Sequence, residues 1–364
     1  MVPGPPLVNA VVDVVVIGAG QAGLSTAYHL RRLGLSFVVL DGAARPGGAW
    51  ASRPPTLTMA KVHGVFDLPG AHRAAVADES SSPASEVVGR YYADYERRFS
   101  LPVLRPVRVT SVSSLPDGRL SVAAADGRSW TARAVANATG TWTRPHWPYY
   151  PGAASFRGRQ LHSSQYRGPA FVAGLRVVVV GGGHSAAHVL SEIADVAASV
   201  TWVTRRPPDF RGGEFTRADG RAVIADVDAR VRAGLPPLSV VAVTGLGYTS
   251  VVREAMEKGV LNPRPMFTRL VPSGVEFADG SVVPADVIVW ATGFRAALGH
   301  LAPLHLREPG GGVRMSATRV VRDPRVHLVG YGPSASTVGA NRAGRSAALE
   351  IKELLASATA RPAA

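Results

Sequence analysis

The sequence contains no cysteine among its 364 residues. This absence excludes disulfide bonds, thiolate metal sites and a redox-active CxxC pair, and with them any dithiol reductase. Long hydrophobic runs are also missing, since no stretch reaches the roughly 20 apolar residues that span a bilayer. Residues 1–6 have no basic start and no cleavable apolar core. We therefore expect no membrane segment, no signal peptide and a cytoplasmic protein.

Lysine is nearly absent, and arginine carries the charge. The only lysines are Lys61, Lys258 and Lys352, while the formal net charge is +14. A basic chain is compatible with nucleic-acid binding, but here the arginines are dispersed and no basic run alternates with aromatic residues. We expect no nucleic-acid partner and assign several arginines to phosphate-bearing cofactors. The histidines show no spacing typical of metal ligands, so we also expect no metal site.

A glycine-rich segment near the N-terminus has the form of a dinucleotide fingerprint. Gly18-Ala19-Gly20-Gln21-Ala22-Gly23 follows an apolar run at 11–17 that predicts a buried strand, and it precedes a helical pattern that ends at Gly34. In such a unit the first glycine makes a tight turn, the second lets the backbone approach a pyrophosphate, and the third lets the helix pack on the strand. The next predicted strand, 37–40, ends at Asp41, where a carboxylate accepts hydrogen bonds from an adenosine ribose. The segment therefore predicts a nucleotide site at a helix N-terminus.

A second segment repeats this arrangement in the middle of the chain. Gly181-Gly182-Gly183-His184-Ser185-Ala186 follows a predicted strand at 176–180, and Ala186 is a tolerated variant of the third glycine. The strand predicted at 200–204 ends in Arg205-Arg206 instead of an acid. Arginine pairs with a 2′-phosphate and stacks on adenine, whereas a carboxylate would repel that phosphate. The second segment therefore predicts binding of NADPH in preference to NADH.

The remaining elements frame these two units. The segment 45–82 resembles a loop, and no repeat of fixed period is present. The patterns predict helices at 86–99 and 343–355, strands within 107–123 and at 128–136, a hairpin at 274–283, and strands at 287–290 and 326–329.

A third motif lies between the two fingerprints. It reads Phe156-x-Gly158-xxx-His162-xxx-Tyr166-Arg167-x-Pro169, and Ala291-Thr292-Gly293-Phe294 follows later in the chain. In this order, the four motifs resemble those of flavin-containing monooxygenases and the related Baeyer–Villiger monooxygenases, most of all the short bacterial single-component members. The resemblance covers Val11 to about Leu349.

The resemblance implies an α/β fold with two nested Rossmann-like dinucleotide-binding domains of the three-layer ββα type. We expect a discontinuous FAD-binding domain formed by residues 1–165 and 286–364. The NADPH-binding domain, residues 166–285, is inserted between its two parts. The expected cofactors are FAD and NADPH, and the expected partners are a small-molecule substrate and oxygen. A homodimer is one oligomeric state that the sequence allows.

The same resemblance distributes roles over the site residues. His162 would be the catalytic residue that couples the nucleotide site to the flavin site. The crossover points between domains would be Thr139-Gly140 and Thr292-Gly293. The other expected contacts to FAD are Gly18, Gly20, Gln21, Ala22, Gly23, Asp41, Gly48, Trp50 and Gly330, and those to NADPH are Gly181, Gly183, His184, Ser185, Ala186, Arg205 and Arg206.

One segment departs from this pattern, and a second segment adds two candidate residues. Many flavoproteins carry Gly-Asp near the end of the chain, with the Asp on the ribityl chain, whereas this sequence reads Gly330-Tyr331-Gly332. Backbone contacts or another group must then replace the carboxylate. Lys61 and His63 lie in a segment that in relatives approaches the reactive face of the flavin, although an exposed or packed role is the simpler expectation for both.

The activity implied is that of an FAD-dependent monooxygenase, in which the flavin is reduced by NADPH and forms a 4a-(hydro)peroxyflavin with oxygen. That species would oxygenate an amine, a thioether or a ketone. A flavin oxidoreductase or oxidase without substrate oxygenation is the alternative enzyme. A non-catalytic nucleotide sensor is a third hypothesis, which the second fingerprint disfavours because a sensor needs only one.

Overall fold

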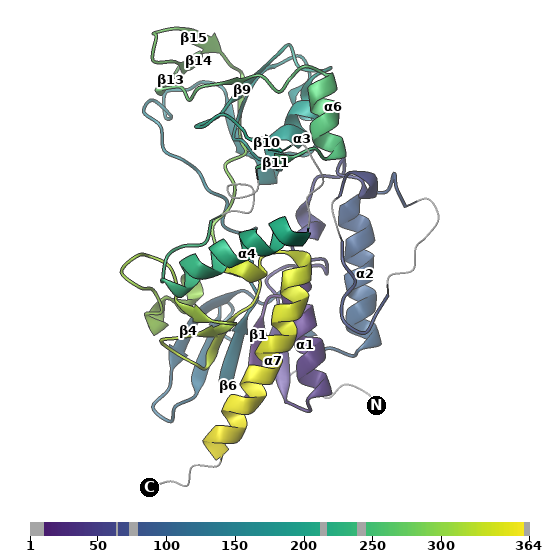
Figure 1. Ribbon diagram of the computed structural model, residues 1–364, viewed down its shortest axis with the longest axis vertical. Coiled ribbons are helices and arrows are strands. Elements are labelled where there is room, and N and C mark those ends of the chain that lie inside the picture. The colour runs from purple at the N-terminus through teal and green to yellow at the C-terminus, as the bar shows by residue number, and fades with distance from the viewer. Residues whose placement is uncertain (1–10, 63–64, 73–78, 212–216, 239–244, 360–364) are drawn as a thin grey trace.

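Two main β-sheets organise the chain, each with a fingerprint helix against it (Figure 1). The computed structural model describes residues 11–62, 65–72, 79–211, 217–238 and 245–359. The first sheet has the order β17-β18-β19-β6-β1-β2-β3, and β5 and β4 extend it beside β6. Its strands are β1 (Val11–Ile17), β2 (Phe37–Leu40), β3 (Val103–Leu104), β4 (Val109–Ser114), β5 (Leu120–Ala124), β6 (Ser129–Asn137), β17 (Met315–Ser316), β18 (Arg319–Val320) and β19 (Val326–Leu328).

The first sheet is covered on both faces, which explains why residues 14–17 of β1 are all apolar. Val14 and Val16 pack on one face with the helices α1 (Gln21–Arg32), α2 (Ala84–Arg98) and α7 (Thr337–Thr359). Val15 and Ile17 pack on the opposite face with β4, β5 and residues 298–306. Because successive side chains of a strand point to opposite faces, a strand buried on both sides has no polar alternation.

The second sheet is parallel throughout and has the order β12-β9-β8-β16-β7. Two helices, α3 (His184–Ile193) and α6 (Ser250–Glu257), share one apolar cluster with it. The strands are β7 (Arg159–His162), β8 (Arg176–Val180), β9 (Ser199–Val203), β12 (Pro263–Arg264) and β16 (Val287–Trp290); two smaller sheets comprise β10 (Phe210–Arg211) with β11 (Leu246–Gly247), and β13 (Arg269–Val271), β14 (Gly274–Glu276) and β15 (Val282–Pro284).

The α/β class and the nested pair of Rossmann-like units are confirmed. The chain leaves the first sheet after β6, forms the second sheet, and returns after β16. The strand pairing places two segments on the other side of the predicted domain boundaries. Residues 159–162 and 287–290, assigned to the FAD domain from sequence, form β7 and β16 of the second sheet. The division into two domains itself stays a prediction.

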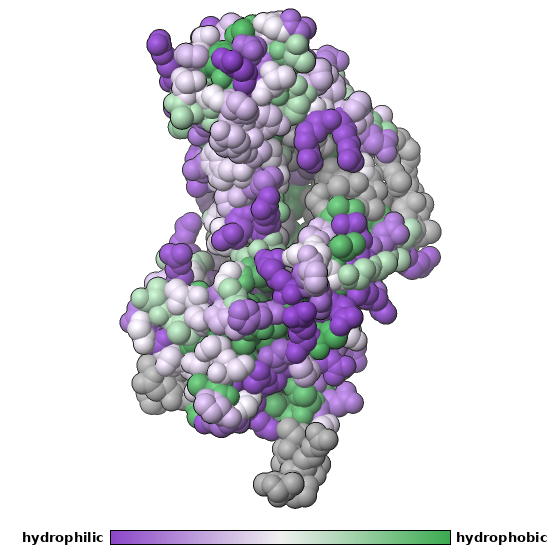
Figure 2. Space-filling model, turned by 90° about the vertical axis from the view of Figure 1, so that its left-hand side faces the viewer, coloured by the Kyte–Doolittle hydropathy of each residue, from purple (hydrophilic) through white to green (hydrophobic). Residues whose placement is uncertain are grey.

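The molecule narrows between the part that carries the second sheet and the part that carries the first (Figures 1 and 2). Its surface in Figure 2 is largely hydrophilic, with apolar side chains in small groups. One helix of the middle segment, α4 (Arg217–Arg232), packs on the first part, where Val231 joins the apolar cluster around β1 and β6. In the part of the chain that the structure describes, no helix is long and apolar enough to cross a membrane.

Candidate functional site at the junction of the two sheets

The first fingerprint forms a turn that only glycine can adopt. Gly18 has a φ of +99°, and an added Cβ there would lie 2.7 Å from the Ala138 carbonyl oxygen. A Cβ on Gly23 would lie 1.8 Å from the Gly18 oxygen, so the helix α1 packs directly on the turn. Gly20 caps α1, and its Cβ position meets nothing closer than 3.9 Å. The open side of Gly20 at a helix N-terminus fits the diphosphate of a dinucleotide.

A second glycine loop closes over this turn. Gly48 has a φ of +54°, and its added Cβ would lie 2.8 Å from the Cα of Gly20. Trp50 follows in η1 (Trp50–Ser52) and packs half-buried beside α1 and α2. The Gln21 side chain is held by the protein, since it donates to Asn341 Oδ1 at 2.8 Å and accepts from the Tyr92 hydroxyl at 2.6 Å. Gln21 therefore fixes α1, and its backbone faces the expected diphosphate.

Asp41 lies at the end of β2, as predicted, but it is part of a charged cluster that the sequence did not indicate. Its Oδ2 accepts a hydrogen bond from Arg105 Nε at 3.0 Å, and its Oδ1 accepts one from Ala43 N at 3.2 Å. Arg105 also donates two bonds to the Glu96 carboxylate, at 2.7 and 2.6 Å. Although burial lowers the pKa of Arg105, the bonds and charges of Glu96 and Asp41 raise it overall. The cluster holds the Asp41 carboxylate in place.

The turn after β19, at the position of the missing Gly-Asp pair, is held by a serine side chain. Gly330 has a φ of +77°, and its Cβ position lies 3.3 Å from the Ala22 Cβ in α1. The Gly330 and Tyr331 N–H groups both donate to Ser334 Oγ, at 3.0 and 3.1 Å. Ser334 therefore supports the turn beside the first fingerprint from within the protein.

The second fingerprint has the same geometry with one substitution. Gly181 has a φ of +137°, and its added Cβ would lie 2.2 Å from the Ala291 oxygen. Gly183 caps α3, and Ala186 is fully buried at the position of the third glycine. The helix begins with His184 and Ser185, which also line the pocket described below. This turn, too, fits a dinucleotide diphosphate.

Arg205 and Arg206 lie exposed just beyond the end of β9. Neither has an ion pair or hydrogen bond to another residue within the described ranges. They therefore present two positive charges at the edge where the second strand of a Rossmann unit meets the adenosine ribose.

The two crossover segments run side by side between the sheets. Thr139 Oγ1 donates to the Ala297 oxygen at 2.8 Å, and Thr292 Oγ1 donates to the His146 oxygen. In return, the N–H of His146 donates to the Gly293 oxygen at 2.9 Å. Gly140 and Gly293 both have positive φ, at +60° and +78°. The threonine–glycine pairs therefore join two chain reversals into one connection.

His162 lies at the end of β7 and is fully buried. Its Nδ1 accepts a hydrogen bond from Ser164 N at 3.1 Å, which leaves Nε2 as the donor to the Gly293 oxygen at 3.0 Å. Burial lowers the pKa of His162, although the bond to Gly293 partly opposes this shift. The imidazole is thus neutral and connects the third motif to the crossover.

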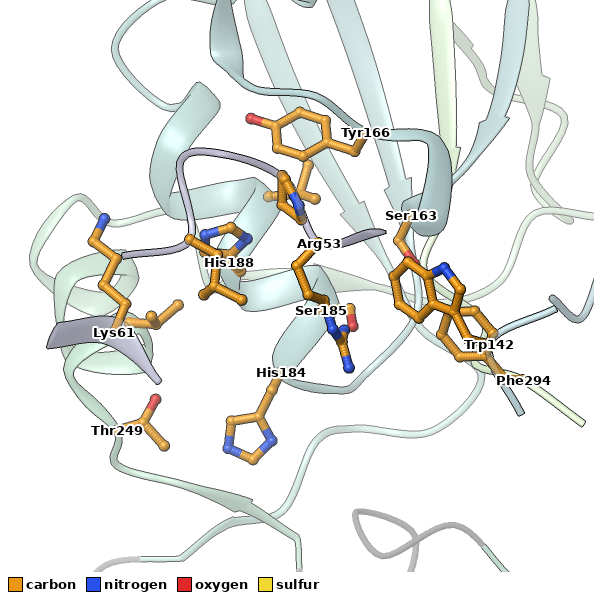
Figure 3. A pocket seen from close by; sticks show the side chains of 14 residues that line it. Arg53, Lys61, Trp142, Ser163, Tyr166, His184, Ser185, His188, Thr249 and Phe294 are labelled. Carbon is orange, nitrogen blue, oxygen red and sulfur yellow. The ribbon is translucent and has the colours of Figure 1, made fainter. Parts of the chain in front are cut away.

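A pocket of about 130 Å³ lies where the parts meet (Figure 3). Residues 53–61 form one wall and the start of α3 forms another. The rings of Trp142 and Phe294, stacked at 4.9 Å, bound a third side. Lys61, at the end of η2 (Met59–Lys61), also lines this space, whereas His63 lies outside the described residues.

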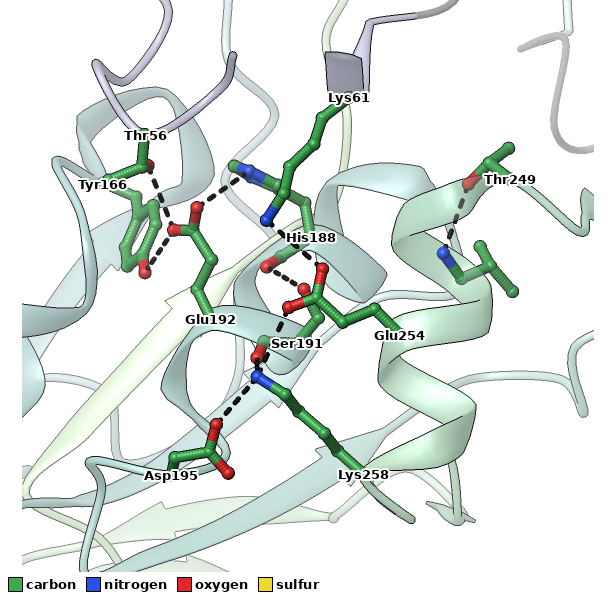
Figure 4. Close-up of polar contacts among 11 residues, drawn as sticks. Thr56, Lys61, Tyr166, His188, Ser191, Glu192, Asp195, Thr249, Glu254 and Lys258 are labelled. Atoms are coloured by element: carbon green, nitrogen blue, oxygen red, sulfur yellow. Dashed lines mark hydrogen bonds and ion pairs between the residues drawn. The ribbon is translucent and has the colours of Figure 1, made fainter. Parts of the chain in front are cut away.

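Glu192 of α3 holds the loop and the third motif together (Figure 4). One oxygen accepts hydrogen bonds from Tyr166 Oη at 2.9 Å and Thr56 Oγ1 at 3.1 Å. The other oxygen lies 3.1 Å from His188 Nε2. Burial alone would raise the pKa of Glu192, but these partners lower it overall. Tyr166 of the predicted motif is therefore an anchor for α3.

A second ionic chain joins the same loop to α6. Lys61 Nζ lies 3.2 Å from Glu254, and Lys258 Nζ lies 3.3 Å from the same carboxylate and 2.8 Å from Asp195 (Figure 4). The acidic partner of Lys61 thus comes from the second part of the molecule. No group of three or more acidic or histidine side chains in the described ranges is arranged to hold a metal.

Comparison with known proteins shows what this chain is similar to. Residues 15–218 match the model of the pyridine nucleotide-disulphide oxidoreductase family. The fold superposes with a TM-score of 0.81 on a flavin-containing monooxygenase from Stenotrophomonas maltophilia, which is 40% identical over 95% of this chain and 99% of that one. A CzcO-like oxidoreductase from Geobacillus kaustophilus is 27% identical over 78% of this chain and 81% of its own.

A more distant structure agrees in fold alone. Cyclohexanone monooxygenase from Rhodococcus sp. Phi1, bound to NADP+, is 19% identical, with a TM-score of 0.66 over 96% of this chain and 85% of that one. The disulphide in the family description has no counterpart here because the sequence has no cysteine.

Proposed function

The chain belongs to the pyridine nucleotide-disulphide oxidoreductase family and, within it, to the flavin-containing monooxygenases, and from this we propose that it transfers one oxygen atom of O2 to a small organic molecule at the expense of NADPH. It is an oxidoreductase of the flavoprotein monooxygenase type, with FAD and NADPH as its cofactors. The substrate class that we propose is an amine, a thioether or a ketone. A cytoplasmic location and a homodimer remain predictions.

The pairing of two fingerprint turns carries this proposal. Gly18 and Gly181 each follow a central parallel strand, each with positive φ, and each turn leads into a helix without a side-chain cap. Free N–H groups at such helix starts bind anions, so the chain is built for two dinucleotides. One dinucleotide site would suit a sensor. Two sites joined through one crossover suit transfer of reducing equivalents.

The protein residues have binding and positioning roles in this reaction. We propose that the Gly18 turn, the Gly48 loop and Asp41 hold FAD, and that the Gly181 turn with Arg205 and Arg206 holds NADPH. Bound FAD supplies the redox and oxygen chemistry, which side chains do not provide. The aromatic rings of Trp142 and Phe294 present an apolar surface to the adjoining pocket.

For His162 we propose a positioning role in place of direct catalysis. The ring has no exposed surface, and both nitrogens are bonded to protein. Its bond to Gly293 ties the end of β7 to the returning crossover, so the imidazole fixes the two parts relative to each other. In this role His162 couples the two sites without contacting the reacting atoms.

The test is an anaerobic reduction of the FAD-loaded protein by NADPH, followed by rapid mixing with oxygen. We expect the flavin band to bleach and then a transient near-ultraviolet absorbance to form before the oxidised spectrum returns. Addition of an amine, thioether or ketone substrate should shorten that transient and yield an oxygenated product. Immediate reoxidation with stoichiometric peroxide would instead establish an oxidase or reductase, and absence of bound flavin would refute the proposal.

A further inference from the structure

Arg53 is a largely enclosed cation at the wall of the junction pocket. It directly follows η1, and its guanidinium carbon lies 4.4 Å from the centroid of the Trp142 ring and 5.8 Å from that of Trp50. Its Nε is buried and has no hydrogen-bond partner. In Figure 3 the guanidinium points toward the start of α3, where Ser185 lines the same pocket.

The acids near this pocket have other partners. No aspartate or glutamate is among the residues that line it. Glu192 and Glu254, from the helices behind it, lie 3.1 Å from His188 and 3.2 Å from Lys61. Glu254 therefore compensates the lysine, and Glu192 already accepts hydrogen bonds from Tyr166 and Thr56. Arg53 forms no ion pair with any residue in the described ranges.

On the other side of Arg53, no acidic side chain compensates its positive charge either. There it borders an open hollow of about 730 Å³ that Arg45, Arg90 and Arg167 also line. The one acid of that hollow is Glu86, which lies 3.8 Å from Arg90. Arg53 therefore lies between two spaces in which positive charge is in excess.

The stacking of Arg53 leaves its best donors available. The attraction of a cation to an aromatic face offsets only part of the cost of enclosing a charge. Burial accordingly lowers the pKa of Arg53, although arginine stays charged in proteins. With the guanidinium face against Trp142, its N–H groups point along the plane of the guanidinium. These N–H groups form the edge of the guanidinium that binds a carboxylate or a phosphate in a bidentate manner.

We propose that Arg53 is an oxyanion-binding residue, and that the pocket between residues 53–61 and the start of α3 takes a phosphate or carboxylate group. This inference rests on the proposed function, because it concerns the pocket shared by the nicotinamide nucleotide and the substrate. The diphosphate of NADPH and a carboxylate on the substrate are the two possible sources of the oxyanion. In either case, the anion fixes the loop that follows Trp50 against α3.

The test measures equilibrium binding to the oxidised, FAD-loaded protein, so that turnover is not needed. NADP+, 2′-AMP, phenylacetate and its neutral amide phenylacetamide are titrated by calorimetry into wild type, Arg53→Ala and Arg53→Lys. Arg90→Ala is the matched control, since it removes an exposed arginine from the neighbouring hollow. Loss of one charge-assisted contact should weaken binding of the relevant anion by about tenfold or more, with partial retention in Arg53→Lys and none of this effect in Arg90→Ala.

The pattern of losses identifies the source of the anion. Weaker NADP+ binding with unchanged 2′-AMP, which lacks the diphosphate, supports the diphosphate. Loss of the preference for phenylacetate over phenylacetamide supports a substrate carboxylate. The inference is overturned if Arg53→Ala binds NADP+ and phenylacetate as tightly as the wild type does, or if the wild type binds neither. Flavin content and bleaching by NADPH are measured on the same samples, so a failure of the proposed function is recognised separately.

Discussion

At the scale of single residues, we propose that Arg205 and Arg206 determine which nicotinamide nucleotide the protein prefers. Both are exposed and neither is paired with an acid in the described part of the chain. A 2′-phosphate would give them their partner. Replacing both with alanine should raise the NADPH concentration for half-maximal flavin reduction by about tenfold to a hundredfold, as expected for one or two charge-assisted bonds.

The control for this prediction is NADH, which lacks the 2′-phosphate. Its half-maximal concentration should change by less than about threefold, which corresponds to loss of adenine stacking alone. Anaerobic reduction at several concentrations of each nucleotide provides the measurement. An equal response to both nucleotides before and after the substitution would contradict the assignment.

Single site residues differ in how far the sequence could predict them. Gly18 and Gly23 belong to a local motif whose spacing predicts their roles. In the structure, an added Cβ at either position would collide with backbone atoms. Arg53, Arg105 and Ser334 carry no such signal. Each acts through a partner distant in sequence or through a turn whose shape appears only after folding. Arg105, for example, meets Asp41 across 64 residues.

Among the elements, α1 depends most on one small residue. A Cβ on Gly23 would lie 1.8 Å from the Gly18 oxygen, so Gly23→Ala must push the helix away from the turn. We expect a loss of about 1–3 kcal/mol in the free energy of unfolding, together with weaker FAD retention. Denaturant unfolding and the flavin content of the purified protein are the measurements.

The chain contains a matched control for this substitution. Gly89 lies within α2, where an added Cβ meets its nearest neighbour at an ordinary 3.6 Å. Gly89→Ala should therefore leave stability unchanged or raise it by about 0.5–1 kcal/mol, because alanine favours the helix. If both substitutions had the same effect, close packing of α1 on the turn would not explain the third glycine.

The elements themselves were predictable where the apolar pattern is long. The strand at 11–17 and the strand at 37–40 have the predicted bounds, and α2 differs from its predicted range by two residues at its start and one at its end. Two-residue strands such as β12 and β17 are too short to show a period. The closing helix α7 begins at Thr337, six residues before its predicted start, since its first turns carry little apolar signal. Sequence also could not show that α4 packs on the first part of the molecule.

At the scale of the whole molecule, the two parts are joined by more than the chain crossovers. The loop after Trp50 is fixed to α3 through Glu192 and to α6 through Glu254. These contacts combine acids from the middle segment with Thr56 and Lys61 from the N-terminal segment. Charge patterns in sequence do not reveal such pairing, because the partners lie more than a hundred residues apart. The nested order of the sheets was predictable from the motifs, whereas this fixation was not.

Sensitivity to acid is also a property of the whole molecule, and His29 of α1, His300 and His327 of β19 contribute to it. Burial lowers the pKa of His29 and His300 to about 4 and that of His327 to about 3. These values lie below that of an unfolded histidine, so the unfolded state binds more protons below about pH 6.5. These groups therefore favour the folded state above that pH and favour it less as the pH decreases, by up to about 1.4 kcal/mol per pH unit for a fully buried histidine such as His327.

His327 offers the sharpest test because it is fully buried in β19 and contacts Thr318 Oγ1 at 2.9 Å. We expect the free energy of unfolding in urea to fall between pH 7 and pH 5, and to fall less steeply in His327→Gln by up to about 1.4 kcal/mol per unit. Burial raises the pKa of the neighbouring Glu350, an effect of opposite sign that both proteins share. Parallel pH profiles for the two proteins would show that protonation of His327 does not limit stability, and the acid sensitivity would then belong to other groups.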